Sequence, residues 1–253
     1  MATQRPASTS SPLSPEVAEL AARHELGELR AAFAPQRLGI MMFALYLFTL
    51  TYLLILVIPA LLLFLWLRRY PNFSRKQASK RLYLFDDGMI MNPQSADGLI
   101  VLRWDSVQLY TNVSQKIING IPGPITYVYT LLPPTGGASA TLTEFYESPG
   151  AWGPWIQEAV VRAQGPTALG TVLEGKTIRF GNFEVSRTGI TAGGRDHLLW
   201  ADFQRIDVEN GRVHIMKTGD AIPWSRSDVK SIANLAVLLT LAENLDGRRT
   251  TGP

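Results

Sequence analysis

The sequence of 253 residues contains no cysteine and only three histidines, His24, His197 and His214. Without cysteine the chain forms no disulfide and offers no thiolate as a metal ligand or nucleophile. No histidine has a second histidine at the spacing of a metal site, so a metal centre would depend on scattered carboxylates. We therefore expect neither a metal nor another cofactor.

Recognisable catalytic motifs are also missing. The chain has no GxSxG nucleophile elbow, and its glycine pairs at 136–137 and 193–194 lack the lysine of a phosphate-binding loop. The triplet DDG at 86–88 resembles the start of a calcium loop, but Met89, Met91 and Pro93 occupy the later ligand positions. We interpret the triplet as a turn and predict a protein without catalytic residues and without enzymatic activity.

The longest uncharged stretch covers residues 38–67, in which Thr49 and Thr51 are the polar interruptions. A helix rises about 1.5 Å per residue and a bilayer core needs about 20 apolar residues. This predicts one transmembrane helix over 38–67 and an integral protein of the cell membrane. A signal peptide is disfavoured because 37 residues precede the run. Two further interpretations are a buried core helix and a re-entrant hairpin bent near Pro59, which enters and leaves on one face.

Acidic side chains are absent from residues 68–81, whereas six basic ones are present. Because clusters of Lys and Arg stay on the cytoplasmic side of a membrane, we expect cytoplasmic C-terminal domains, with the N-terminal tail outside if the helix crosses once. A topology signal is the simpler interpretation. As contacts for anionic lipid, worth about 1 kcal/mol each near the surface, the candidates are Arg68, Arg69, Arg75, Lys76, Lys80 and Arg81. A second candidate is the loop 114–124 with Lys116.

The whole chain has a net charge of +3, but its larger part is net acidic. Residues 82–253 carry 14 basic and 17 acidic residues. A domain that binds nucleic acid needs a basic face. We therefore expect no nucleic-acid partner.

The remaining pattern predicts an α+β chain of short strands and a few helices. Residues 1–14 are rich in Ser, Thr and Pro, which favours disorder. Within segment 15–37 an amphipathic or tail helix is expected from Pro15 to Phe33, with Ser14 as its N-cap. Strands follow the basic linker, among them one over the alternating residues 125–131, and lead to a helix over 151–163. A second set of strands leads to a helix from Asp228 to Asn244 with Ser227 as its N-cap, and 247–253 form a tail.

The two sets of strands share letters. The hexapeptide LRWDSV at 102–107 aligns with LLWADF at 198–203, at a constant offset of 96. We interpret this as two copies of one module, at 82–165 and 166–246. Trp104, Trp200 and Trp224 are expected to pack inside these modules rather than to form a ligand surface.

Several short antiparallel strands closed by one helix resemble a pleckstrin-homology-like domain. The resemblance is sharpest in the second half, at FG 180–181, RTGI 187–190, LWADF 199–203 and Trp224 before NLAVL 234–238. In the first half it depends on YLFDDGM 83–89 and RWDSV 103–107. These segments are similar to an uncharacterised family of bacterial membrane proteins with pleckstrin-homology-like domains. The resemblance implies a membrane-anchored chain with two small β-barrel or sandwich domains, each closed by a C-terminal helix, and supplies no catalytic positions.

The expected function is that of a non-enzymatic, membrane-anchored interaction protein. Its two modules would be presented at the cytoplasmic membrane face to bind a protein, a peptide or a lipid headgroup. The alternative is an accessory subunit of a membrane complex, recognised through the transmembrane helix. That second interpretation is less favoured because the apolar run has neither a charge nor a small-xxx-small glycine motif.

Overall fold

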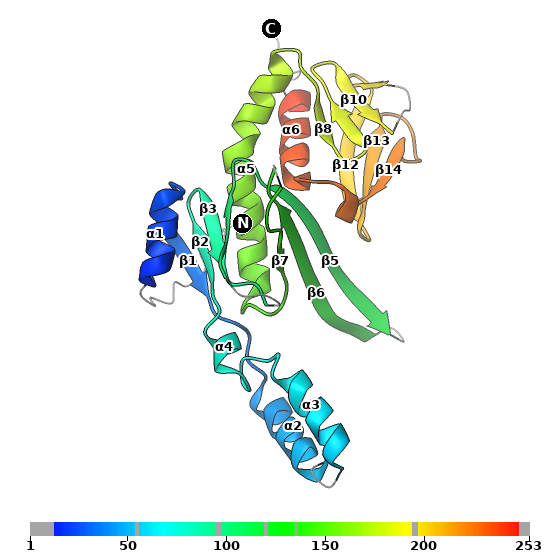
Figure 1. Cartoon of the computed structure of the whole chain (residues 1–253). Helices are drawn as coiled ribbons and strands as arrows, with labels where there is room; N and C mark the ends of the chain where they lie inside the picture. Colours follow the sequence, from blue (N-terminus) through cyan, green and yellow to red (C-terminus); the bar gives the residue numbers. More distant parts are fainter. Residues whose placement is uncertain are drawn as a thin grey trace. The chain divides into compact units, whose positions relative to one another are not determined.

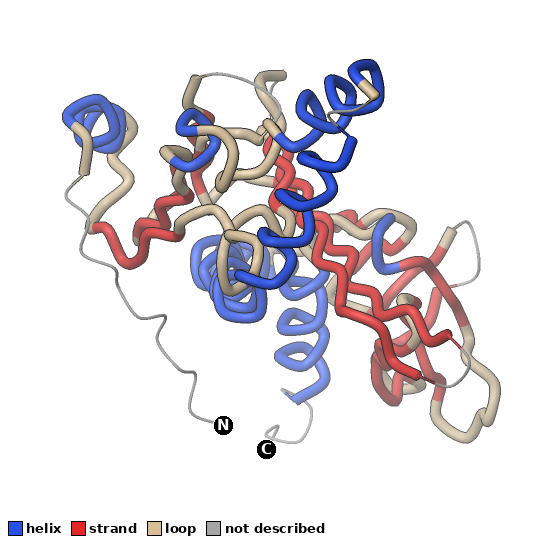
Figure 2. The backbone as a smooth tube through the Cα atoms, turned by 90° about the horizontal axis from the view of Figure 1, so that it is seen from below, coloured by secondary structure: helices blue, strands red, loops and turns tan. Residues whose placement is uncertain are grey.

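The computed structural model describes residues 13–53, 56–94, 98–118, 121–134, 136–193 and 197–247. Most of the two expected tails, 1–14 and 247–253, lies outside these ranges. In the described part there are six α-helices and fourteen strands (Figure 1), and Figure 2 distinguishes helices from strands by colour. The chain divides into two compact units, Met1–Val101 with Glu144–Pro149 and Leu102–Thr143 with Gly150–Pro253.

The first unit is built on an antiparallel sheet in the order β1-β2-β3-β4. Its strands are β1 (Leu29–Phe33), β2 (Leu82–Phe85), β3 (Gly88–Met91) and β4 (Ile100–Arg103), the last of which runs into the second unit. Every residue of β2 and β3 is buried, so both faces of these strands are covered. On one face, Val17 and Ala21 of α1 (Pro15–Arg23) belong to the same core cluster as Tyr83 and Ile90.

Helix α1 begins as the sequence predicts and ends earlier. The Ser14 hydroxyl accepts a hydrogen bond from the Val17 N–H at 3.4 Å, which confirms the N-cap. The expected continuation to Phe33 is wrong. Glu25 and Gly27 have φ values of 50° and 73°, and these left-handed residues turn the chain out of the helix. Residues 29–33 then pair with β2 as a strand.

The single helix expected over 38–67 is also wrong. The run forms two helices, α2 (Ile40–Leu53) and α3 (Val57–Leu67), which lie side by side (Figure 1). No described helix combines the length and the apolar character needed to cross a membrane. The expected localisation as an integral protein that crosses the cell membrane, and the cytoplasmic placement derived from that crossing, are therefore corrected.

Proline explains why the run is divided. In one continuous helix Pro59 would lie in the interior, where its ring clashes with the preceding turn and a backbone hydrogen bond is lost. With α3 beginning at Val57, Pro59 falls in the first turn, where no N–H is needed within the helix. Below, "the hairpin" denotes α2 and α3.

The hairpin is an insertion between two neighbouring strands. Phe33 at the end of β1 and Leu82 at the start of β2 are paired across the sheet. The chain between them contains the hairpin and the short helix α4 (Arg75–Ala78). Below, "the excursion" denotes residues 34–81, whose two ends meet at one point of the sheet. The hairpin is thus inserted within its unit, whereas the sequence predicted an anchor that precedes the first domain.

The described part of the second unit contains three antiparallel sheets and two long helices. The first sheet joins β5 (Gln108–Ile118), β6 (Ile121–Leu132) and β7 (Ala140–Leu142), and α5 (Pro149–Leu173) follows it. The second has the order β11-β10-β9-β8 and the third β12-β13-β14. Their strands are β8 (Ile178–Phe180), β9 (Phe183–Val185), β10 (Gly189–Ala192), β11 (His197–Leu199), β12 (Phe203–Glu209), β13 (Arg212–Lys217) and β14 (Ser225–Asp228).

The final helix differs from its expected position. A strand ends at Asp228, a turn of 3-10 helix, η1 (Val229–Ser231), follows, and α6 runs over Leu235–Gly247. Asn234, directly before α6, has a φ of 52°. The predicted start at Asp228 with Ser227 as N-cap is therefore wrong. Along the chain each half gives four strands in one sheet, three in another and then a long helix.

Candidate functional site: the hairpin and its basic base

The hairpin exposes apolar side chains on all sides. No residue of α2 is buried, and in α3 only Ala60 and Leu67 are. The exposed fraction reaches 90% at Ile40, 70% at Phe48 and 76% at Val57. Helices that are apolar all round normally lie in a protein core or in lipid. An exposed surface of this kind favours an apolar surrounding.

The polar side chains within the hairpin are satisfied locally. The Thr49 hydroxyl donates to the Leu45 carbonyl and the Thr51 hydroxyl to the Leu47 carbonyl, both at 2.9 Å. Such bonds to the residue four positions earlier leave no threonine donor unpaired on the helix surface. The two polar interruptions of the run are therefore compatible with an apolar surrounding.

Aromatic rings gather where the two helices return to the sheet. Trp66 stands edge-on to Tyr46 and Tyr70, with ring centroids 5.8 and 5.0 Å apart. Phe43 and Phe73 form a further pair at 5.2 Å. The Asn72 side-chain oxygen accepts a hydrogen bond of 2.9 Å from the Leu38 N–H, which ties the entering chain to the leaving one. We call these five rings the aromatic collar.

The structure divides the six predicted basic residues into two groups. Arg68, Arg69, Arg75 and Lys76 are exposed and follow α3 directly or lie on α4. Lys80 is buried, and its ammonium donates to the carbonyls of Pro93 and Gln94 at 2.5 and 2.9 Å.

Arg81 is engaged in the same way. Its guanidinium donates to the carbonyls of Ala78 and Lys80 at 2.6 and 2.7 Å. Lys80 and Arg81 therefore hold the backbone in place, whereas the other four predicted residues are exposed.

Arg37 is a basic residue that was not predicted as a site residue from the sequence. It is exposed and precedes the apolar run by one position, at the other end of the excursion. Its position next to the run was the available signal. Residues 34–81 include no Asp or Glu. We define the base cations as the five exposed residues Arg37, Arg68, Arg69, Arg75 and Lys76.

The second predicted lipid contact lies on a β-hairpin and not in a loop. Residues 114–118 belong to β5 and residues 121–124 to β6, and the two strands pair with each other. The side chain of Lys116 and residues 119–120 are outside the described part, so a lipid contact at Lys116 stays a prediction.

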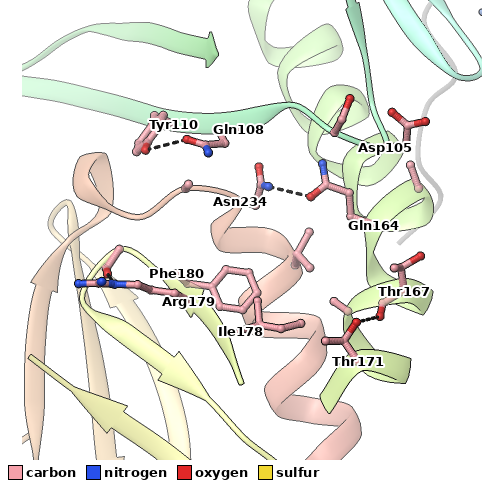
Figure 3. A pocket seen from close by; sticks show the side chains of 16 residues that line it. Asp105, Gln108, Tyr110, Gln164, Thr167, Thr171, Ile178, Arg179, Phe180 and Asn234 are labelled. Atoms are coloured by element: carbon pink, nitrogen blue, oxygen red, sulfur yellow. Dashed lines mark hydrogen bonds between the residues drawn. The ribbon is translucent and has the colours of Figure 1, made fainter. Parts of the chain in front are cut away.

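A hollow of about 640 Å³ lies within the second unit, between α5, the start of β5, β8 and the residues before α6 (Figure 3). The amide of Asn234 points toward Gln164 and donates to its side-chain oxygen at 2.8 Å. Asn234 also accepts from the Leu109 N–H at 2.7 Å, and Gln164 donates to the Trp104 carbonyl at 2.6 Å. These amides are occupied in joining three segments of chain, which is a structural task.

The tryptophans take the expected structural roles in part. Trp104 and Trp200 are buried, so their prediction as packing residues is confirmed, whereas Trp224 is half-buried. The rings of Trp104 and Trp155 stand edge-on with centroids 6.2 Å apart, and the indole N–H of Trp200 donates to the Ser186 carbonyl at 3.1 Å. Within the described ranges, His, Asp and Glu side chains do not gather in threes as a metal site requires.

Comparison with known proteins gives one match. A family model described as "Family of unknown function (DUF6585)" matches residues 13–250, a range that includes the hairpin, its base and both units. No curated protein and no solved structure matches the chain.

Proposed function

The chain belongs to the DUF6585 family of unknown function, and we propose that it is a non-enzymatic binding protein that attaches to anionic lipid surfaces. The observation that carries the proposal is the set of five exposed base cations directly beneath an exposed apolar hairpin, in an excursion without an acidic residue. A partner that fits both features has an anionic outer layer for the cations and an apolar layer beneath it for the hairpin. A lipid headgroup layer is such a surface.

The base cations are sufficient for a measurable attraction. Each Lys or Arg near an anionic lipid surface contributes about 1 kcal/mol. Since the excursion has no Asp or Glu, no carboxylate within it offsets this attraction. The interaction is confined to about 8–10 Å at ordinary ionic strength, so the cations must approach the headgroups closely. Their exposure at the base permits that approach.

The β-rich modules have a separate role in this proposal. The order of a four-stranded sheet, a three-stranded sheet and a long helix occurs twice along the chain. This order, together with the resemblance of the sequence motifs, supports two pleckstrin-homology-like modules. Fixing these modules at a lipid surface raises their effective concentration for partners at the same surface.

Co-sedimentation of the full chain with lipid vesicles tests the proposal. We expect binding to vesicles of phosphatidylcholine with phosphatidylserine, and weaker binding to phosphatidylcholine alone. Changing all five base cations to Gln should remove most of the difference between the two lipids.

The matched control changes five exposed cations of the second unit to Gln, which alters the net charge equally: Lys176, Arg179, Arg205, Arg212 and Arg226. This control should bind as the unmodified chain does. Equal loss in both variants, or no preference for anionic vesicles, would contradict the proposal. If the chain binds neither kind of vesicle, a protein partner is favoured instead.

A further inference from the structure

We infer that the hairpin enters the hydrocarbon of one leaflet of that lipid surface without crossing it. The choice of a lipid surface depends on the proposed function, and the depth and mode of entry go beyond it. Four properties of the hairpin carry the inference: its length, the distribution of its apolar side chains, its satisfied polar groups and the position of its ends.

The length matches a single leaflet. At about 1.5 Å per residue, the 14 residues of α2 extend about 21 Å and the 11 residues of α3 about 16 Å. The hydrocarbon core of a bilayer is about 30 Å thick, so one leaflet offers about 15 Å. Both helices reach through the hydrocarbon of one leaflet, and neither reaches through two.

The distribution of apolar side chains fits hydrocarbon better than a protein groove. A helix that docks in a groove covers one stripe and keeps a polar face. In α3 the successive residues Val57 and Ile58 are 76% and 73% exposed, and Leu61 and Leu62 are 56% and 63% exposed. Because a helix has 3.6 residues per turn, successive residues point about 100° apart, so several faces are apolar at once. Acyl chains contact all of these faces.

The polar groups permit the same surrounding. Away from its first and last turns a helix satisfies its own backbone groups, as a segment in hydrocarbon requires. Between the two helices the Leu56 N–H donates to the Leu53 carbonyl at 2.8 Å. The hydroxyls of Thr49 and Thr51 donate hydrogen bonds to backbone carbonyls of α2. Between Leu38 and Leu67 the sequence has no ionisable acid or base other than tyrosine. Charge begins again at Arg37 on one side and Arg68 on the other.

The aromatic collar and the base cations lie together at the end of the hairpin that joins the sheet. Both ends return to the paired residues Phe33 and Leu82, so the excursion enters and leaves on the same side. The aromatic collar and the base cations lie at this end. Trp and Tyr favour the boundary between hydrocarbon and water, and Lys and Arg favour the headgroups outside it. The hairpin thus has an apolar tip, an aromatic boundary and a cationic exterior.

The absence of native cysteine makes a direct test possible. A Val57→Cys variant of the full chain carries one thiol near the tip, which is labelled with the environment-sensitive dye NBD. The control is Ile222→Cys, because Ile222 in the second unit is 73% exposed, close to the 76% of Val57. With anionic vesicles we expect a blue shift and a several-fold rise in emission for Val57→Cys, and no change for Ile222→Cys.

Quenchers then locate the dye. Nitroxide on the acyl chains should quench NBD at position 57, and iodide added outside or enclosed inside the vesicle should not. Quenching by enclosed iodide would overturn entry into one leaflet, because the tip would have crossed. A blue shift without vesicles would also overturn the inference, since a second copy would then cover the hairpin.

The two proposals fail differently. If the chain sediments with anionic vesicles while position 57 stays open to external iodide, the leaflet inference is wrong and the proposed function stands. If the chain does not sediment with anionic vesicles, the proposed function itself is wrong. A Val57→Asp variant should lower vesicle binding, whereas Ile222→Asp should not, and equal effects would contradict the inference.

Discussion

Phe33 and Leu82 are directly paired in adjacent strands although the whole hairpin lies between them in sequence. The sheet of the first unit therefore closes without the hairpin, as an ordinary β-hairpin with a long connection would. The connection is long in residues, but closing a longer loop costs little additional entropy, about 0.6 kcal/mol for each doubling of length. The apolar hairpin is thus a feature added to a sheet that does not depend on it.

Removal of the hairpin should leave the fold intact. Replacing residues 40–66 by a short Gly-Ser linker keeps Leu67 and removes mainly exposed side chains. We expect the free energy of unfolding in urea to change by no more than about 1 kcal/mol. Vesicle binding should become purely electrostatic and disappear near 1 M salt, where the Debye length is about 3 Å. The unmodified chain should retain binding at that salt, and equal salt sensitivity of the two proteins would contradict this prediction.

Lys80 and Lys76 should respond differently to the same substitution. Lys80→Ala leaves two carbonyls without their buried donor, and we expect a loss of about 1–3 kcal/mol in the free energy of unfolding. Lys76 is exposed, so Lys76→Ala should change stability by less than about 0.5 kcal/mol. Urea unfolding measures both. Equal losses of stability would show that the burial of Lys80 has no energetic consequence.

Gly153 of α5 should not tolerate a side chain. A Cβ at this position would lie 2.5 Å from the Tyr129 hydroxyl oxygen and 2.8 Å from its ring. We expect Gly153→Ala to lower stability by about 1–3 kcal/mol through overpacking. Gly170 in the same helix has no heavy atom within 4 Å of such a Cβ, and Gly170→Ala should raise stability by up to about 1 kcal/mol. Thermal unfolding of the two variants gives the comparison.

Asn234 has a left-handed backbone conformation, and its side-chain oxygen and nitrogen both form hydrogen bonds. Asn234→Ala removes the hydrogen bonds to Leu109 and Gln164 and keeps the unfavourable φ of 52°, so we expect a loss of about 2–3 kcal/mol. Asn234→Gly removes the same bonds but relieves the backbone, and should be about 1 kcal/mol more stable than Asn234→Ala. Urea unfolding separates the two effects. If Ala and Gly variants are equally stable, the left-handed conformation is not a cost.

Tyr146 should make stability fall at alkaline pH. Burial raises the pKa of Tyr146, whose hydroxyl donates to the Asn92 carbonyl. The unfolded chain therefore loses this proton first, near the ordinary tyrosine pKa of about 10. The stabilisation is fully present below about pH 10 and is lost as pH rises toward the folded-state pKa. Tyr146→Phe should show a shallower alkaline decline in urea unfolding, and an unchanged slope would contradict the assignment.

Local signals in the sequence were sufficient for some elements. Ser14 predicts a helix start because its hydroxyl satisfies an N–H two or three residues later, and the structure confirms this bond. The alternating residues 125–131 predict a strand, and β6 contains them. The large apolar residues Trp104 and Trp200 predict burial, which the structure also confirms.

Other features depend on partners that are distant in sequence. Residues 29–33 read LRAAF and favour a helix by composition, yet pairing with β2 across the excursion makes them a strand. Lys76 and Lys80 belong to one basic cluster in the sequence, and the sequence does not show that Lys80 is buried against the carbonyls of residues 93 and 94. The uncharged run predicted one long helix because its length outweighed the single proline that divides it.

The paired position of Phe33 and Leu82 also determines how the molecule would bear mechanical load. A pull on the hairpin tip reaches the sheet at these two residues at once and draws β1 and β2 in the same direction. The hydrogen bonds between β1 and β2 are therefore not the ones that such a pull separates. The load passes instead to the pairing of β2 with β3.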